Sequence, residues 1–266
     1  MPPIALITDF GLQDAYVGIM KGVIAAIAPP VRCLDITHMV PPQNLRVAQF
    51  HLMAAVPYLP PGTVYLVVVD PGVGSDRHAI AVRFPGGTIV CPDNGVLTGL
   101  LGRYSPAQLQ AVTLTQPAYW LVSPDSESAQ TSATFHGRDI FAPVAAHLAL
   151  GTPLEQVGDP IALTSLVQKP ELSLPKQASS GVIQHIDHFG NLISTISAAA
   201  VQDRWSAVIG HRTIPSGKTY SSVAAGELVA LIGSHGWIEI AANGGRASDL
   251  LQGTIGQHIA IVTPKA

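Results

Sequence analysis

The first half of the chain alternates between largely apolar runs and segments with helical spacing. Residues 4–10, 31–37 and 62–70 are apolar runs that end in polar residues, as strands buried on both faces do. Residues 14–29 and 44–59, which lie between them, place apolar side chains three and four positions apart, and this spacing indicates helices. The order predicts an α/β/α domain with a mainly parallel sheet.

The same pattern continues and then changes in the second half. Residues 79–84 and 87–95 read as further strands, and residues 139–151 read as a helix that starts near Asp139. We therefore expect an N-terminal α/β domain over residues 1–164. Residues 165–180 are rich in Pro, Ser and Lys, which is typical of a linker.

Short apolar runs separated by frequent turns fill the rest of the chain, with few helical stretches. This pattern predicts an antiparallel, barrel-like β domain over residues 181–266. Its expected strands lie at residues 181–187, 191–197, 206–210, 212–215, 227–233, 237–241 and 258–262.

Composition narrows the class of protein. The 266 residues are 47% hydrophobic, enough for a sizeable core, and the formal net charge of −3 with no long basic run argues against a nucleic-acid partner. Cys33 and Cys91 lie in unrelated contexts, so neither a disulfide framework nor a structural zinc site is expected. No signal peptide and no membrane-spanning apolar stretch is evident, and we expect a cytoplasmic protein without a membrane partner.

Acidic residues close three of the predicted strands. Asp9, Asp35 and Asp70 each lie at a strand end, where open parallel sheets bind ligands. Asp9 and Asp70 are followed by glycine-bearing turns, which allow a backbone to approach a ligand closely. Each of these aspartates could instead be a helix cap or a turn former.

Three other segments carry candidate polar groups. Asp70 and Arg77 bracket a short glycine loop, and a guanidinium folded back onto the carboxylate forms either part of a site or a structural salt bridge. His136 precedes Gly137 at the entrance of a predicted helix, a place for a side chain that faces a cleft, although a lone histidine is often structural. Residues 187–191 combine a carboxylate and an aromatic ring, which together suit an organic cation, whereas simple turn chemistry explains Gly and Asn alone.

Several common motifs are absent from the sequence. It contains no glycine-rich dinucleotide fingerprint after the first strand, no phosphate-binding P-loop, no HExxH and no GxSxG. These absences weaken dinucleotide-binding, nucleotide-triphosphatase, zinc-protease and serine-hydrolase interpretations.

Seven segments together resemble one family, the S-adenosyl-L-methionine (SAM) hydroxide adenosyltransferases, which are relatives of fluorinating and chlorinating enzymes that use the same substrate. The similar segments follow the family's order over nearly the whole chain: residues 7–24, 35–44, 62–77, 91–98, 134–151, 186–191 and 234–245. The resemblance implies hydrolysis of SAM, as substrate and not as cofactor, to adenosine and L-methionine. It also implies a homotrimer whose active sites lie between the N-terminal domain of one subunit and the C-terminal domain of its neighbour, with no cofactor and no metal.

The resemblance also assigns residues. The family's water-activating set falls on Asp70, Arg77 and His136, and its ribose-binding carboxylate falls on Asp9. The remaining substrate-binding positions are Phe135, Asp187 for the amine, Phe189 and Asn191 at the nucleoside, Ser234 at the methionine carboxylate, and Asn243 and Gly244 at the adenine.

Departures from the fluorinating relatives separate the alternatives. Asp70, His136 and Gly137 stand where those enzymes have Tyr, Tyr and Ser, so hydroxyls that hold a halide are replaced. Gln43 stands in place of a tryptophan, and His235 in place of an arginine that binds the carboxylate. The open alternatives are a halogenase of the same fold, a non-catalytic adenosine or SAM sensor, and a metal-dependent phosphoesterase that uses Asp9, Asp14 and Asp70.

Overall fold

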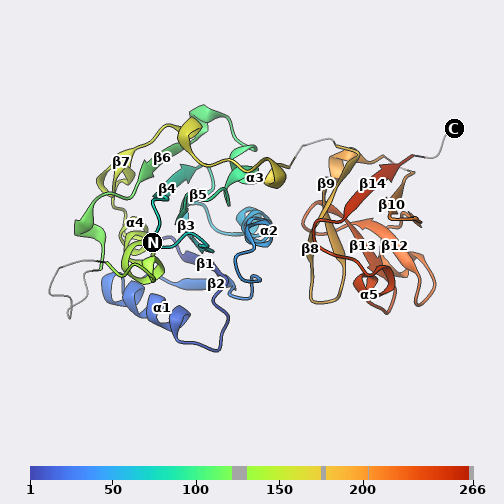
Figure 1. The fold of residues 1–266 in the computed structure, drawn as a ribbon, viewed down its shortest axis with the longest axis horizontal. Helices are drawn as coiled ribbons and strands as arrows, with labels where there is room; N and C mark the ends of the chain where they lie inside the picture. The colour runs from blue at the N-terminus through green and yellow to red at the C-terminus, as the bar shows by residue number, and fades with distance from the viewer. Residues whose placement is uncertain (122–130, 175–177, 203, 264–266) are drawn as a thin grey trace. The chain divides into compact units, whose positions relative to one another are not determined.

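The computed structural model describes residues 1–121, 131–174, 178–202 and 204–263. The chain forms two compact units, Met1–Ser173 and Leu174–Ala266, shown in Figure 1. Among the described residues, no helix combines the length and the hydropathy needed to span a bilayer.

The N-terminal unit is built on a seven-stranded mixed sheet in the order β2-β1-β3-β5-β4-β6-β7. The pairs β1–β2, β1–β3 and β3–β5 are parallel, and the pairs from β5 to β7 are antiparallel. The strands are β1 (Ile4–Thr8), β2 (Cys33–Thr37), β3 (Thr63–Val68), β4 (Ala79–Phe84), β5 (Gly87–Pro92), β6 (Gln110–Thr113) and β7 (Asp159–Pro160).

Helices cover both faces of this sheet (Figure 1). The connection from β1 to β2 runs toward one edge of the sheet, and the connection from β2 to β3 runs back toward the other edge. Because both crossovers are expected to be right-handed, their helices lie on opposite faces of the sheet. Ile4 and Leu6 of β1 share a core with Met20 and Ile24 of one helix, and a second helix packs on β1, β2 and β3. The helices are α1 (Tyr16–Ile27), α2 (Leu45–Ala55), α3 (Thr98–Leu101) and α4 (Ala142–Ala149).

Two helix boundaries follow from local chemistry. Asn44 caps α2 because its side chain accepts a hydrogen bond from the Val47 N–H, at 3.1 Å. The helix predicted from Asp139 begins earlier, as a π-helical turn over Gly137–Phe141 that continues into α4. Short 3-10 turns complete the unit at Val56–Tyr58, Pro106–Gln108, Pro117–Tyr119, Leu154–Gln156, Leu163–Ser165 and Pro170–Leu172.

The connection from β3 to β4 has an unusual path. Strand β5 lies between these two strands in the sheet, so residues 69–78 must pass across the end of β5 before the chain enters β4. This crossing segment carries Asp70 and Arg77. The turn that follows β5 therefore lies against the segment with the strongest candidate chemistry.

The C-terminal unit is a seven-stranded antiparallel sheet in the order β11-β10-β14-β8-β9-β13-β12. A bridge between Ser216 and Ala230 links the two edges, so the sheet nearly closes into a barrel. The predicted fold class is confirmed for both sheets. The elements are β8 (Ser180–Ile186), β9 (Leu192–Ser197), β10 (Ser206–Ile209), β11 (Arg212–Pro215), β12 (Leu228–Ile232), β13 (Trp237–Ala242), β14 (His258–Val262) and α5 (Ala247–Leu251), with 3-10 turns at Ala198–Ala200 and Tyr220–Ser222.

Candidate active site

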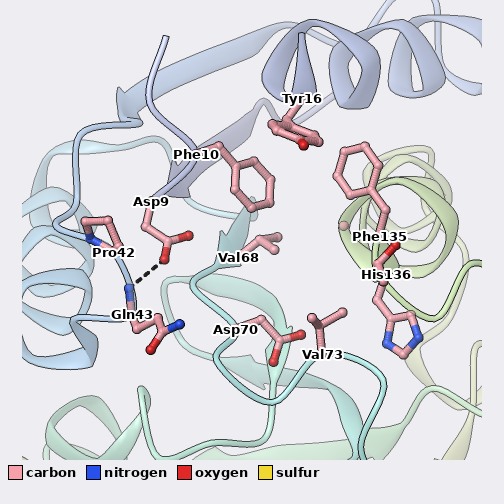
Figure 2. Close-up of a pocket in the computed structure, with 12 residues that line it drawn as sticks. Asp9, Phe10, Tyr16, Pro42, Gln43, Val68, Asp70, Val73, Phe135 and His136 are labelled. Carbon is pink, nitrogen blue, oxygen red and sulfur yellow. Dashed lines mark hydrogen bonds between the residues drawn. The ribbon is translucent and has the colours of Figure 1, made fainter. Parts of the chain in front are cut away.

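A pocket of about 370 Å³ opens beyond the carboxyl ends of β1 and β3. Thr8 and Val68 are the last paired residues of these strands, and Asp9 and Asp70 follow them. After β1 the chain continues to β2 at one edge of the sheet, whereas after β3 it continues toward the other edge. Open α/β sheets bind ligands at such a point, where two neighbouring strands are followed by connections in opposite directions. Figure 2 shows both carboxylates in this pocket.

The Asp9 side of the pocket is fixed by a contact from the loop between β2 and α2. The backbone N–H of Gln43 donates to the Asp9 carboxylate at 2.8 Å (Figure 2). Gln43 has a φ of 64°, a conformation that few residues other than glycine adopt. This strained backbone turns the N–H toward Asp9 and leaves the Gln43 side chain on the pocket wall.

Asp70 and Arg77 form a bidentate pair. The Arg77 Nε–H donates to one carboxylate oxygen of Asp70 at 2.9 Å, and Arg77 Nη2 donates to the other. The Asp70 side chain is 6% exposed and the Arg77 side chain 10%, so solvent screens the pair weakly. The guanidinium carbon also lies over the Phe141 ring, 5.3 Å from its centre, so the planar group packs on an aromatic face.

His136 completes the cluster. Its Nδ1 lies 2.9 Å from Arg77 Nη2, and because a guanidinium has no acceptor, Nδ1 must accept this hydrogen bond. The neutral ring then carries its proton on Nε2. Burial and the nearby Arg77 charge lower the pKa of His136, against the opposing pull of Asp70 and Asp139. The ring is therefore a neutral Nε2–H donor near pH 7.

Two distant loops meet to build this cluster. Gly74, at a φ of 78°, approaches the segment before His136 so closely that an added Cβ would lie 2.4 Å from the Ala133 carbonyl oxygen. Only glycine permits that approach. It places the loop of Asp70 beside the chain that leads into the π-helical turn starting after His136.

Three aromatic rings form the apolar wall of the pocket. Phe10, Tyr16 and Phe135 pack with ring centres 5.3 to 5.9 Å apart, two of the pairs edge to face. Figure 2 shows the three rings together in the upper part of the view, with Asp70 below them and Asp9 beside Phe10. Of these rings, Phe135 alone was predicted from the sequence; an aromatic residue directly after the Asp9 position was the available signal for Phe10.

The other predicted binding residues lie in the C-terminal unit. In the tight turn between β8 and β9, the backbone N–H of Asn191 donates to the Asp187 carboxylate at 2.8 Å, and the side-chain amide of Asn191 donates to it at 3.0 Å. Phe189, at the tip of this turn, is 71% exposed. The turn thus presents a rigid carboxylate and an aromatic face to the outside of its own unit.

The second loop region of this unit holds the remaining predicted residues. The Asn243 amide donates to the Val223 carbonyl at 2.8 Å, and Gly244 follows with a φ of 74°. Ser234 precedes His235, whose Nε2 lies 3.1 Å from the buried carboxylate of Glu239. Tyr220 donates its hydroxyl to the same carboxylate at 3.0 Å, so Glu239 is held by both His235 and Tyr220; neither Tyr220 nor Glu239 was singled out from the sequence.

Among the residues that the structure describes, no three histidine, cysteine, aspartate or glutamate side chains cluster as a metal site would require. Asp9, Asp14 and Asp70 therefore do not form the trio that the phosphoesterase alternative proposed. The pocket offers carboxylates, a neutral imidazole and aromatic rings, a combination suited to a polar organic molecule.

Comparison with protein families decides the relationship. The models described as the SAM hydroxide adenosyltransferase N-terminal and C-terminal domains match residues 4–158 and 181–260. The chain belongs to this family. The expected resemblance is confirmed, and the two matched domains cover most of both structural units.

Similar proteins within the SAM hydroxide adenosyltransferase family carry a specific activity in their names. An (R)-S-adenosyl-L-methionine hydrolase of Thermus thermophilus is 42% identical over 94% of this chain and 96% of its own. One of Salinispora arenicola is 38% identical over 98% and 97%. A fluorinase of Actinopolyspora mzabensis is more distant, at 27% identity over 91% of each chain.

Solved structures show that the whole fold is shared. An uncharacterized conserved protein from Thermotoga maritima superimposes with a TM-score of 0.86 at 37% identity, over 97% of this chain and all of that one. A conserved hypothetical protein from Thermus thermophilus gives a TM-score of 0.82, also at 37% identity, over 98% of this chain and all of that one.

Proposed function

We infer that this chain is a SAM hydrolase, which converts SAM and water to adenosine and L-methionine. The relatives named as hydrolases align with almost the entire chain. The observation that supports the chemistry is the part-buried cluster of Asp70, Arg77 and His136, which borders a pocket large enough for part of a nucleoside-sized ligand.

The chemical difficulty lies in the nucleophile. The sulfonium makes methionine a good leaving group, but forming free hydroxide from water at pH 7 costs about 12 kcal/mol, at about 1.36 kcal/mol for each of nearly nine pK units. General-base assistance contributes about 10²- to 10⁴-fold in rate, and alignment of the water with C5′ contributes further. A proton acceptor that acts as attack proceeds removes the need for free hydroxide.

We assign separate roles to the three residues. Asp70 accepts the proton, because His136 Nδ1 is engaged by Arg77 and its Nε2 already carries hydrogen. The His136 Nε2–H donates to the oxygen of the water and fixes its direction. Arg77 holds the Asp70 carboxylate in plane, and its positive charge favours the negative charge that develops on the water oxygen.

The remaining predicted residues bind substrate. We propose that Asp9 binds the ribose hydroxyls and that Phe135 packs on the nucleoside. In the C-terminal unit, Asp187 is proposed for the methionine amine, Phe189 and Asn191 for the nucleoside, Ser234 for the methionine carboxylate, and Asn243 and Gly244 for the adenine. No cofactor is required by this scheme. Cys33 and Cys91 are unpaired, in keeping with a reducing cytoplasmic location.

A product assay tests the activity and its stereochemistry. Incubation with SAM should yield adenosine and methionine in equal amounts by chromatography, and the names of the relatives lead us to expect consumption of the R epimer at sulfur before the S epimer. Chloride or fluoride should give no 5′-halogenated nucleoside, because a carboxylate at position 70 repels a halide. A halogenated product would support the halogenase alternative, and binding without turnover would support a sensor.

We further propose a homotrimer whose sites combine the N-terminal unit of one copy with the C-terminal unit of a neighbour. Two features support it: the residues that line the pocket all fall within residues 9–137, and Phe189 is exposed on its own unit. Sedimentation should give three times the mass of 27.8 kDa.

Mixed trimers test the shared site. The variants Asp70→Asn and Asp187→Ala should each be nearly inactive alone. Coexpressed in equal amounts, they should recover about one quarter of wild-type activity, because one site in four receives both intact halves when subunits mix at random. No recovery would place both halves of a site in one chain.

A further inference from the structure

The turn after β5 holds both ends of the loop that carries Asp70 and Arg77. The Asn94 side-chain amide donates to the carbonyl of Val69, immediately before Asp70, at 2.8 Å. The backbone N–H of Asp93 donates to the carbonyl of His78, immediately after Arg77, at 2.9 Å. Two consecutive residues of one turn therefore fix the two ends of the crossing segment.

The turn itself is well anchored. The Asn94 Oδ1 accepts from the Val96 N–H at 3.2 Å, which sets the conformation of the turn. The Asp93 carboxylate, 6% exposed, accepts from the Val167 N–H at 2.9 Å. Asn94 thus connects a fixed turn on one side with the residue before Asp70 on the other.

Position in the sheet explains why this support is needed. Val69 lies one residue beyond the last β1–β3 pair, and three residues beyond the last β3–β5 pair, so strand pairing does not reach it. It is nevertheless fully buried. Its carbonyl needs a partner inside the protein, since a buried unpaired carbonyl is unfavourable, and the Asn94 amide provides one.

We propose that Asn94 is a positioning residue for the reaction: it does not touch substrate, but its hydrogen bond to Val69 fixes the direction in which the Asp70 carboxylate meets the attacking water. Without that bond the Val69 carbonyl turns toward another donor, and the peptide group that joins Val69 to Asp70 rotates with it. This inference rests on the assignment of Asp70 as proton acceptor. Displacement of a reacting group by about 1 Å costs up to about 100-fold in rate.

The variant Asn94→Ser isolates this hydrogen bond. A serine hydroxyl can still accept from the N–H two residues later, as Ser132 does for Thr134 at 3.3 Å, but it is too short to reach Val69. We expect kcat to fall about 10- to 100-fold while KM for SAM changes less than about threefold, because the groups assigned to substrate binding are untouched.

A double-mutant cycle separates positioning from general damage. In an Asp70→Asn background the additional change Asn94→Ser should lower kcat by less than about twofold, because no carboxylate remains to be positioned. Equal losses in the two backgrounds would overturn the inference, as would a kcat for Asn94→Ser within about twofold of wild type.

Gln49 offers a matched control in the same unit. Its buried amide also makes two backbone hydrogen bonds: it donates to Leu172 at 2.8 Å and accepts from Gly99 at 2.7 Å. Gln49→Met should lower the melting temperature at least as much as Asn94→Ser does, yet leave kcat within about twofold of wild type. If Asp70→Asn alone leaves kcat unchanged, the assignment of Asp70 as proton acceptor is wrong. If Asp70→Asn lowers kcat but Asn94→Ser does not, that assignment stands and only the inference about Asn94 is wrong.

Discussion

Replacing Asp70 by asparagine should reduce kcat for SAM hydrolysis by about 10³-fold, within the range that general-base catalysis contributes. Asparagine keeps the shape of the side chain, but its amide cannot take a proton from water. The amide also turns at least one N–H toward the donors of Arg77, which weakens the bidentate contact. Adenosine binding, measured by calorimetry, should change less than about threefold, because binding does not require the base.

Asp76 provides the matched control for this substitution. It lies in the same loop, next to Arg77, but it is exposed and outside the pocket. Asp76→Asn makes the same chemical change and should leave kcat within about twofold of wild type. Wild-type turnover in Asp70→Asn would contradict the assigned base.

Replacing His136 by alanine should lower kcat about 10²-fold and also change the pH profile. Because burial and Arg77 lower the pKa of His136, the ring is neutral at pH 7 and becomes protonated only below its ordinary value of 6.5. Protonation places hydrogen on Nδ1, against the Arg77 donor, and disrupts the cluster. Wild-type kcat/KM should therefore fall as the pH drops below about 6.5, with a midpoint beneath that value.

His136→Gln tests the same point with a side chain that does not titrate. It should keep more activity than the alanine variant, since its amide can donate a hydrogen bond. Its kcat/KM should no longer fall below about pH 6.5, because the titration of His136 is removed. His147 is the control, because burial also lowers its pKa although it lies on α4 and outside the pocket. If kcat/KM of His136→Gln still falls at low pH as in the wild type, or if His147→Gln removes that fall, the titration belongs to a group other than His136.

The pattern of apolar residues along the chain was enough to predict most strands of the N-terminal sheet and most of its helices. Strands buried on both faces give a continuous apolar run, which is a strong local signal. It also placed Asp9 and Asp70 at strand ends, where open parallel sheets bind ligands. That β1 and β3 are neighbours in the sheet is known only from the structure. Strands β6 and β7 were missed. They are short strands of four and two residues, the last two at one end of the sheet, and their pairing is decided by contacts with distant parts of the chain.

The supporting residues of the site were beyond the reach of pattern alone. The sequence left open whether Asp70 and Arg77 are part of a site or form a salt bridge alone, and it could not show that His136, 59 residues after Arg77, lies within hydrogen-bond distance of Arg77. Gln43 and Asn94 act through single hydrogen bonds to Asp9 and Val69, and no periodicity records such contacts. The π-helical turn after His136 likewise depends on its packing in the folded unit.

The crossing of residues 69–78 over β5 has a consequence for how this scaffold can change. The loop is secured at its two ends, while the group that binds the Asp9 carboxylate belongs to a separate loop after β2. Substitutions within residues 69–78 can therefore change the groups at Asp70 and Arg77 without altering the backbone N–H of Gln43 that holds the Asp9 carboxylate. The loop between β3 and β4 is thus a place where side chains beside the pocket can change while the loop that borders Asp9 is kept.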